Sequence, residues 1–208
     1  MQIQALQTPL VKLHDQLWPI IQTAIASQLG QLPEKSVIAI SSKIISYAQG
    51  RLVPKTAADL TDAVVCKAHK NQLIRQEADW YLDPNQSRYQ LMFTIKNDTL
   101  AVNAGVDESN AGDNFVLWPE NLPMVLADLW LKLRTEFKIK AVGLVVTDSK
   151  TYPLRWGVTA TCLAHCGFLA LNDCRGQTDL FGRKMEMEQV NLAEAIAVAA
   201  ALEMGEVA

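Results

Sequence analysis

Tyr89-Gln-Leu-Met-Phe-Thr-Ile-Lys-Asn-Asp-Thr-Leu-Ala-Val-Asn103 is the stretch that decides the fold. Segments 89–95 and 99–103 are rich in residues that favour strands, and Asn97-Asp98 between them favours a tight turn. We therefore expect a β-hairpin in the middle of the chain. A hairpin at this place, among irregularly ordered strands and helices, favours an α+β fold with mixed or antiparallel sheets and packed helices over a doubly wound parallel sheet.

The rest of the chain is interpreted as strands and helices of one domain over residues 1–208. Apolar periodicity predicts helices over four segments: 13–29, 57–79, 122–138 and 191–204. Two β-branched runs, 36–45 and 140–147, are typical of buried strands. Pro19 fits the first helix only if that helix begins near Trp18, so that the proline lies in its first turn. Segment 1–10 is expected to be a strand or otherwise extended, and 162–171 fits either a strand or a helix.

Composition excludes several classes of protein. Of the 208 residues, 19 are basic and 22 acidic, so the formal net charge is -3 and gives no reason to expect nucleic acid as a partner. No apolar run reaches the roughly 18 residues of a membrane span, and the N-terminus lacks the pattern of a signal peptide. We therefore expect a cytoplasmic protein with reduced cysteines.

Cys162, His165 and Cys166 raise the question of a metal site. Their spacing, C-x-x-H-C, is not that of a standard zinc pair, and no second pair occurs elsewhere in the chain. We favour the simpler interpretation, that these cysteines are small, inert side chains within the fold.

Two acidic strings follow predicted strands and are candidates for cation binding. Asn103-Ala-Gly-Val-Asp-Glu-Ser-Asn110 carries several oxygen-bearing side chains, which hard divalent cations prefer as ligands. On this string alone an ordinary polar turn is equally good. Asp148, with Ser149 beside it, ends the hydrophobic strand 140–147, where it fits either a rigidly held ligand or a turn residue.

Other strings are weaker when each is considered alone. Arg155 in Pro153-Leu-Arg-Trp-Gly157, and the arginines of the segment 173–183, lie among glycines, where they suit phosphate or carboxylate groups. Solvated surface charge is the commoner explanation for each of them. Glu206 follows the last predicted helix and would by itself mean nothing.

Taken in order, however, six strings resemble the coenzyme F-420-0:gamma-glutamyl ligase family, in a short form. They run from about residue 36 to the C-terminus: Ser41-Ser-Lys-Ile-Ile-Ser-Tyr-Ala-Gln-Gly-Arg51, Asn103-Ala-Gly-Val-Asp-Glu-Ser-Asn110, Val-Val-Thr-Asp148, Pro-Leu-Arg155-Trp-Gly157, Asp179-Leu-Phe-Gly-Arg183 and Met-Gly-Glu206. The Ala-Gly-Val-Asp-Glu-Ser-Asn string is the most specific of the six. Six matches in the same order make chance a poor explanation.

The resemblance implies an enzyme, a GTP-dependent ligase that forms an amide bond between L-glutamate and a carboxylate of a cofactor precursor. An acyl-phosphate forms first, and magnesium or manganese ions assist, with a monovalent cation as a further ion that the family allows. The acceptor is the coenzyme F-420 precursor by default, and a folate-type pterin is the alternative. The family fold is a two-part α+β structure that forms an intertwined homodimer.

By position, the resemblance gives Asp107, Asp148 and Ser149 the role of metal ligands, with Ser149 where the family commonly has threonine. Glu206 resembles a ligand of a second metal. Ser42, Lys43 and Asn110 resemble nucleotide contacts. Arg155 is chosen, on charge and position, as the catalytic residue that steadies an anionic substrate.

Two departures from the family pattern favour a second hypothesis. Tyr47 stands where the family usually has lysine, followed by Gln49 in place of glutamate. After Asp148 the chain reads Ser-Lys-Thr-Tyr152, where the family has a Gly-Arg pair. A nucleotide- or cofactor-binding homodimer without turnover is therefore kept as an alternative.

Overall fold

The computed structural model describes residues 1–206 and shows a mixed α+β fold, as the central hairpin predicts. Its helices are α1 (Leu17–Leu29), α2 (Ser42–Gln49), α3 (Ala57–Thr61), α4 (Ala63–Glu77), α5 (Leu122–Phe137) and α6 (Leu192–Met204), with short 3-10 turns η1 (Pro84–Gln86) and η2 (Asn103–Gly105). Its strands are β1 (Ser36–Ser41), β2 (Leu52–Pro54), β3 (Trp80–Tyr81), β4 (Phe93–Lys96), β5 (Thr99–Val102), β6 (Asn114–Val116), β7 (Val142–Thr151), β8 (Val158–Cys166), β9 (Leu171–Asp173) and β10 (Gln189–Asn191).

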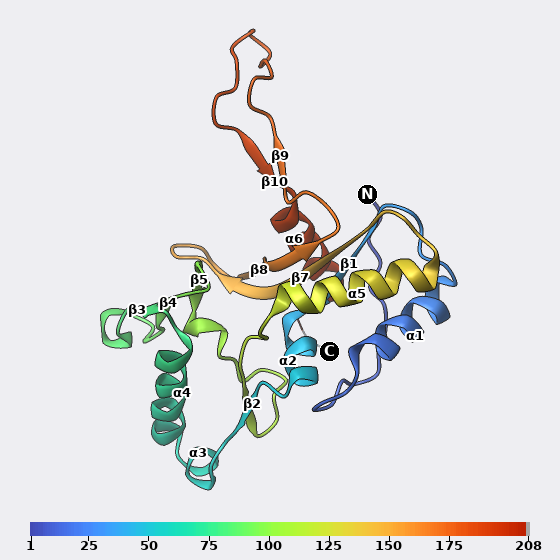
Figure 1. Ribbon diagram of the computed structural model, residues 1–208. Coiled ribbons are helices and arrows are strands. Elements are labelled where there is room, and N and C mark those ends of the chain that lie inside the picture. Colours follow the sequence, from blue (N-terminus) through green and yellow to red (C-terminus); the bar gives the residue numbers. More distant parts are fainter. Residues whose placement is uncertain (207–208) are drawn as a thin grey trace.

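A three-stranded sheet in the order β1–β7–β8 forms the centre of the molecule. β1 runs parallel to β7, with Ser41 opposite Thr147, and β8 runs antiparallel to β7. The run Val142–Val146 is buried throughout, because α5 covers one face of the sheet and α6 the other (Figure 1). A strand that is covered on both faces needs a continuous apolar run, which explains why β7 lacks an alternating pattern.

The first hydrophobic core lies between this sheet and helices α1 and α5. Along α5, Leu122, Leu126, Leu129 and Leu133 recur at helical spacing and are buried. They pack against residues of β1 and β7. This core fixes the ends of β1 and β7 side by side.

The central hairpin belongs to a second sheet, β3–β4–β5. Asn97 and Asp98 both have positive φ, 51° and 57°, as a two-residue hairpin turn of the primed type requires. A second core lies between this region, α4 and β6, and includes Ile74, Met92 and Phe115. The two cores are separate clusters of buried side chains.

Several boundaries differ from the sequence predictions. The predicted helix 57–79 is two helices, because the Asp62 side chain caps a new helix by accepting the backbone N–H of Val64. Segment 1–10 contains no strand, and the first hairpin strand begins at Phe93 rather than Tyr89. α1 begins at Leu17, which places Pro19 in its first turn as the alternative interpretation required. Of the ambiguous segment 162–171, residues 162–166 form the end of β8, residues 167–170 form a loop, and Leu171 begins β9.

An arm of residues 167–191, which contains the β9–β10 pair, projects from the body of the molecule (Figure 1). Its outermost side chains include the strongly exposed Leu180 and Phe181. Within residues 1–206, none of the helices combines the length and the apolar character that a membrane crossing requires.

Candidate functional site

The acidic segment begins with an unusual backbone that the second core holds in place. Asn103, Ala104 and Gly105 all have positive φ, although only the last is a glycine. Ala104 and Val106 are buried in the second core, and Asp107 exchanges two backbone hydrogen bonds of 2.9 Å with Val116. Left-handed non-glycine residues are unfavourable and persist only where surrounding structure enforces them. The segment is therefore built into the fold rather than being a free polar turn.

Asp107 lies in a small cluster of oxygen atoms around the ammonium group of Lys43. The Lys43 Nζ donates to Asp107 Oδ2 at 2.6 Å, to the Ser109 carbonyl at 2.7 Å and to Ser109 Oγ at 2.8 Å. Burial alone would raise the pKa of Asp107, but the hydrogen bonds from Lys43 and Ser109 outweigh it and lower that pKa to about 2. Asp107 is thus a carboxylate at any physiological pH.

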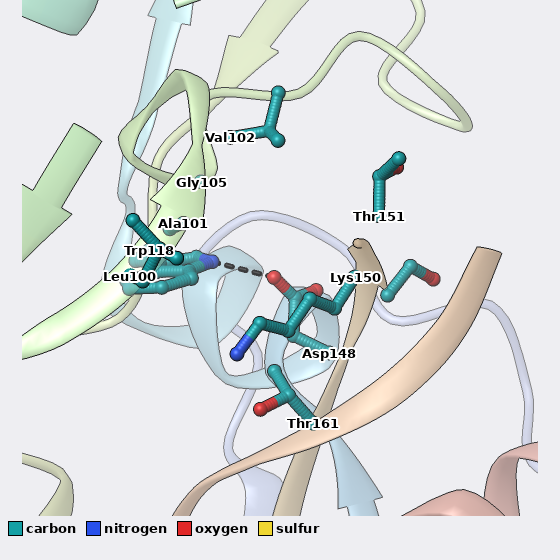
Figure 2. Close-up of a pocket in the computed structure, with 10 residues that line it drawn as sticks. Leu100, Ala101, Val102, Gly105, Trp118, Asp148, Lys150, Thr151 and Thr161 are labelled. Carbon is teal, nitrogen blue, oxygen red and sulfur yellow. Dashed lines mark hydrogen bonds between the residues drawn. The ribbon is translucent and has the colours of Figure 1, made fainter. Parts of the chain in front are cut away.

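Asp148 is the second carboxylate of the site, on β7 beyond the buried run. Its Oδ1 accepts from Ser42 Oγ at 2.7 Å. Its Oδ2 accepts from the indole N–H of Trp118 at 2.5 Å (Figure 2). Burial raises the pKa of Asp148, these two hydrogen bonds oppose the rise, and the negative charge of Asp107 adds to it. The two carboxylates therefore lie close enough to repel each other.

A cavity of about 60 Å³ lies beside Asp148. Leu100 and Ala101 of β5 line it together with Trp118, Lys150 and Thr161, so the hairpin sheet and the central sheet both contribute walls (Figure 2). The candidate site is therefore at the place where the two cores meet. Parallel pairing of β1 with β7 brings Ser42, the first residue after β1, next to Asp148.

The other residues singled out from the sequence fall at different places. Glu108 turns away from Asp107 and pairs with Lys55 and Lys70 at 2.7 and 2.8 Å, which attaches the loop to α4. The Asn110 carbonyl accepts a 3.1 Å hydrogen bond from the hydroxyl of Tyr47. Both contacts hold the acidic segment against neighbouring helices.

Ser149 and Glu206 form a pair of their own, and Arg155 lies apart from all of them. Ser149 Oγ donates to Glu206 Oε2 at 2.8 Å. Neighbouring residues on a strand point to opposite faces, so Ser149 does not share the partners of Asp148. Arg155 lies at the exposed tip of the β7–β8 hairpin, outside the contacts around Asp107 and Asp148.

The donor set at Asp107 and Asp148 fits a hard divalent cation. Three oxygen atoms already surround the positively charged Lys43 Nζ. A bound cation would also relieve the repulsion between the Asp107 and Asp148 carboxylates. Within residues 1–206, no group of three His, Cys, Asp or Glu side chains gathers closely enough to hold a metal. Magnesium commonly takes one or two protein carboxylates and completes its shell with water and substrate phosphates. The carboxylates of Asp107 and Asp148 are therefore enough for such a site.

Comparison with known proteins identifies the family of this chain. A family model described as F420-0:Gamma-glutamyl ligase matches residues 5–208. The chain belongs to this family. It is 28% identical to the coenzyme F420:L-glutamate ligase of Methanopyrus kandleri, over 88% of this chain and 74% of that protein. It is equally similar, at 28%, to the proteins of the same name from Archaeoglobus fulgidus (95% of this chain, 79% of that protein) and Methanocaldococcus jannaschii (89% and 77%).

Sequence reasoning missed two residues that shape the site of this gamma-glutamyl ligase family member. Trp118 holds Asp148, and Ser109 supplies two of the oxygen atoms around Lys43. Nothing in the sequence marks Trp118 as a site residue. It follows β6 in an apolar run, where a tryptophan is ordinarily expected to belong to the hydrophobic core. Ser109 belongs to the acidic string, but the contact of its carbonyl with Lys43 depends on the local backbone conformation, which the sequence does not show.

Replacing Asp148 with asparagine should stabilise the protein at neutral and alkaline pH. A carboxyl group whose pKa is raised by folding costs stability as pH rises above its pKa in the unfolded chain, and the cost is complete once pH exceeds the folded pKa, so the neutral amide removes it. We expect a higher Tm than that of the unmodified protein at pH 8, with a difference that shrinks as pH falls and Asp148 becomes protonated. Thermal unfolding of both proteins between pH 4 and pH 8 measures it. A pH-independent difference would show that Asp148 carries no buried charge.

Proposed function

We propose that this chain is a nucleotide- and metal-dependent ligase that forms an amide bond between the amine of L-glutamate and a carboxylate of a coenzyme F420 precursor. One observation carries the proposal: Asp107 and Asp148, from separate elements, meet beside Lys43 and Ser42 at the start of α2. Two carboxylates, an ammonium group and a helix N-terminus suit the phosphates of a metal–nucleotide complex. The names of the relatives supply the class of acceptor.

The reaction balances as two displacements. An oxygen of the acceptor carboxylate attacks the γ-phosphorus of GTP, and GDP leaves with its bridging oxygen. The glutamate amine then attacks the acyl carbon of the acyl-phosphate, inorganic phosphate leaves, and the amine loses a proton. Such phosphoryl transfer requires positioning and charge neutralisation more than covalent chemistry by the protein. A magnesium or manganese ion, when bound, supplies most of that neutralisation.

The residues of this chain have separate proposed roles in binding the ions, the nucleotide and the substrate. Asp107 and Asp148 hold the ion, and Ser149 with Glu206 are proposed for a second one. Lys43 can leave the oxygen cluster for a nucleotide phosphate once a metal carries the charge of Asp107, and Ser42 and Asn110 contact the nucleotide. Arg155 steadies an anionic substrate from the hairpin tip. A monovalent cation is a further candidate for the oxygen cluster.

The assembled enzyme is proposed to be an intertwined homodimer. The projecting arm and the β7–β8 tip expose Leu180, Phe181 and Trp156 almost completely, and large apolar side chains displayed in this way favour association. Arg155 lies beside Trp156, so association at the tip would also enclose the residue proposed to bind substrate. Sedimentation equilibrium of the whole chain tests this, with a monomer at micromolar concentration as the contrary result.

Phosphate release under defined conditions tests the ligase proposal. The protein is incubated with L-glutamate, magnesium or manganese, GTP or ATP, and either a deazaflavin F420 precursor or a folate acceptor. We expect phosphate release that requires both acceptor and glutamate, with an acceptor product heavier by one glutamyl residue. Nucleotide binding by calorimetry without such release would instead support the non-catalytic alternative that Tyr47 raises.

A further inference from the structure

Asp148 receives hydrogen bonds from two sides, and only one of the donors is a hydroxyl. Ser42 approaches from α2. The indole N–H of Trp118 approaches from the segment after β6, as Figure 2 shows. A serine hydroxyl rotates and can turn its oxygen towards another partner. The indole N–H is a donor only, on a rigid ring, so it fixes one orientation of the carboxylate.

The position of Trp118 is itself determined by three neighbours. A Cβ at Gly105 would lie 2.1 Å from the indole nitrogen, so only a glycine leaves room for the ring in this position. The buried Lys96 lies 5.8 Å from the ring centroid on its face and is paired with Glu77. Arg51 Nε donates to the Trp118 carbonyl at 3.1 Å, and Arg51 also pairs with Glu77. The ring is therefore fixed before any ligand binds.

These contacts join the two halves of the site. Trp118 is buried at 7% exposure, between the left-handed loop that leads to Asp107 and the strand that carries Asp148. A hydrogen-bonded neighbour that orients a metal-binding carboxylate typically changes metal affinity 10- to 100-fold when it is removed.

We propose that Trp118 is a positioning residue that holds the Asp148 carboxylate in the orientation in which it binds a divalent cation together with Asp107. The inference rests on the proposed cation site, but it concerns a residue that takes no part in the chemistry. It also explains the role of Gly105, Lys96 and Glu77, which together determine the position of the indole ring.

Manganese binding without nucleotide or acceptor tests the inference. Free Mn²⁺ is counted by electron paramagnetic resonance at pH 8, where no turnover is needed. We expect Trp118→Phe to weaken Mn²⁺ binding about 10- to 100-fold. Trp130→Phe is the matched control, because Trp130 likewise donates its indole N–H, to the Val142 carbonyl at 2.8 Å, but on α5 and away from the site. Its Mn²⁺ affinity should equal that of the unmodified protein.

Two further variants separate the possible outcomes. Trp118→His keeps an N–H donor in a smaller ring and should bind Mn²⁺ more tightly than Trp118→Phe does. If the loss of affinity came from a general loss of folding, both variants would have a lowered Tm and their Mn²⁺ affinities would be equal. If Asp148→Asn abolishes Mn²⁺ binding while Trp118→Phe binds as tightly as the unmodified protein, the positioning role is wrong and the cation site stands. If the unmodified protein binds no Mn²⁺, the cation site is wrong, and the inference with it.

Discussion

Replacing Asp107 with asparagine is expected to lower acceptor-dependent phosphate release about 1,000-fold. The substitution removes one of two carboxylates proposed to hold the metal, and several kcal/mol of transition-state stabilisation depend on that ion. About 4 kcal/mol corresponds to three orders of magnitude in rate. The measurement is kcat for phosphate release at saturating nucleotide, together with Mn²⁺ affinity, which should fall as well.

Asp113→Asn is the control for this experiment. Asp113 lies six residues further along the same loop and is exposed, so the same chemical change should leave both rate and Mn²⁺ affinity within about twofold. Equal rates for Asp107→Asn and the unmodified protein would show that the acidic segment is a structural turn. On this string alone, such a turn is as good an interpretation as a cation site.

Replacing Gly105 with alanine is expected to have the largest effect on stability. Gly105 has a φ of +74°, where a Cβ is strained, and the new methyl group would lie 2.1 to 2.3 Å from three atoms of the Trp118 indole. Backbone strain of about 1 kcal/mol and overpacking of about 2 kcal/mol together lower Tm by roughly 6–12 °C in a chain of this size. Differential scanning calorimetry measures the loss.

Gly112→Ala separates the two causes. Gly112 also has positive φ, +56°, but a Cβ there would meet nothing within 4 Å. We expect only the strain component, about 1 kcal/mol. Similar losses at both glycines would mean that contact with Trp118 contributes nothing. A displaced indole should also weaken Mn²⁺ binding in Gly105→Ala, whereas Gly112→Ala should bind normally.

The fold class could be predicted because it depends on local signals. Asn97-Asp98 specifies a hairpin turn, and the leucines of α5 recur at helical spacing. The errors arose where one side chain changes the path of the backbone. Asp62 divides what looks like one helical segment into α3 and α4, because its side chain caps the second helix. The spacing of apolar residues does not reveal a capping residue in the middle of such a segment.

For the candidate site, the sequence points to residues that the structure brings together, but it does not show their contacts. Asp107, Asp148, Lys43 and Ser42 were all named from the sequence, and the structure brings them together. Which of them touch depends on the parallel pairing of β1 with β7, a long-range contact that leaves no local pattern. Glu108 shows the limit clearly, since it neighbours Asp107 in sequence yet pairs with lysines on the opposite side of the loop.

The direct test of the ligase chemistry follows the oxygen atoms of the acceptor. An acceptor whose reacting carboxylate carries two ¹⁸O atoms is converted in the presence of GTP, glutamate and magnesium, and the products are analysed by mass spectrometry. Formation of an acyl-phosphate transfers one labelled oxygen to the released phosphate and leaves the other in the new amide. Labelled phosphate in equal amount to the glutamyl product is the expected result. Unlabelled phosphate, or phosphate without glutamyl product, would contradict a ligase centred on Asp107 and Asp148.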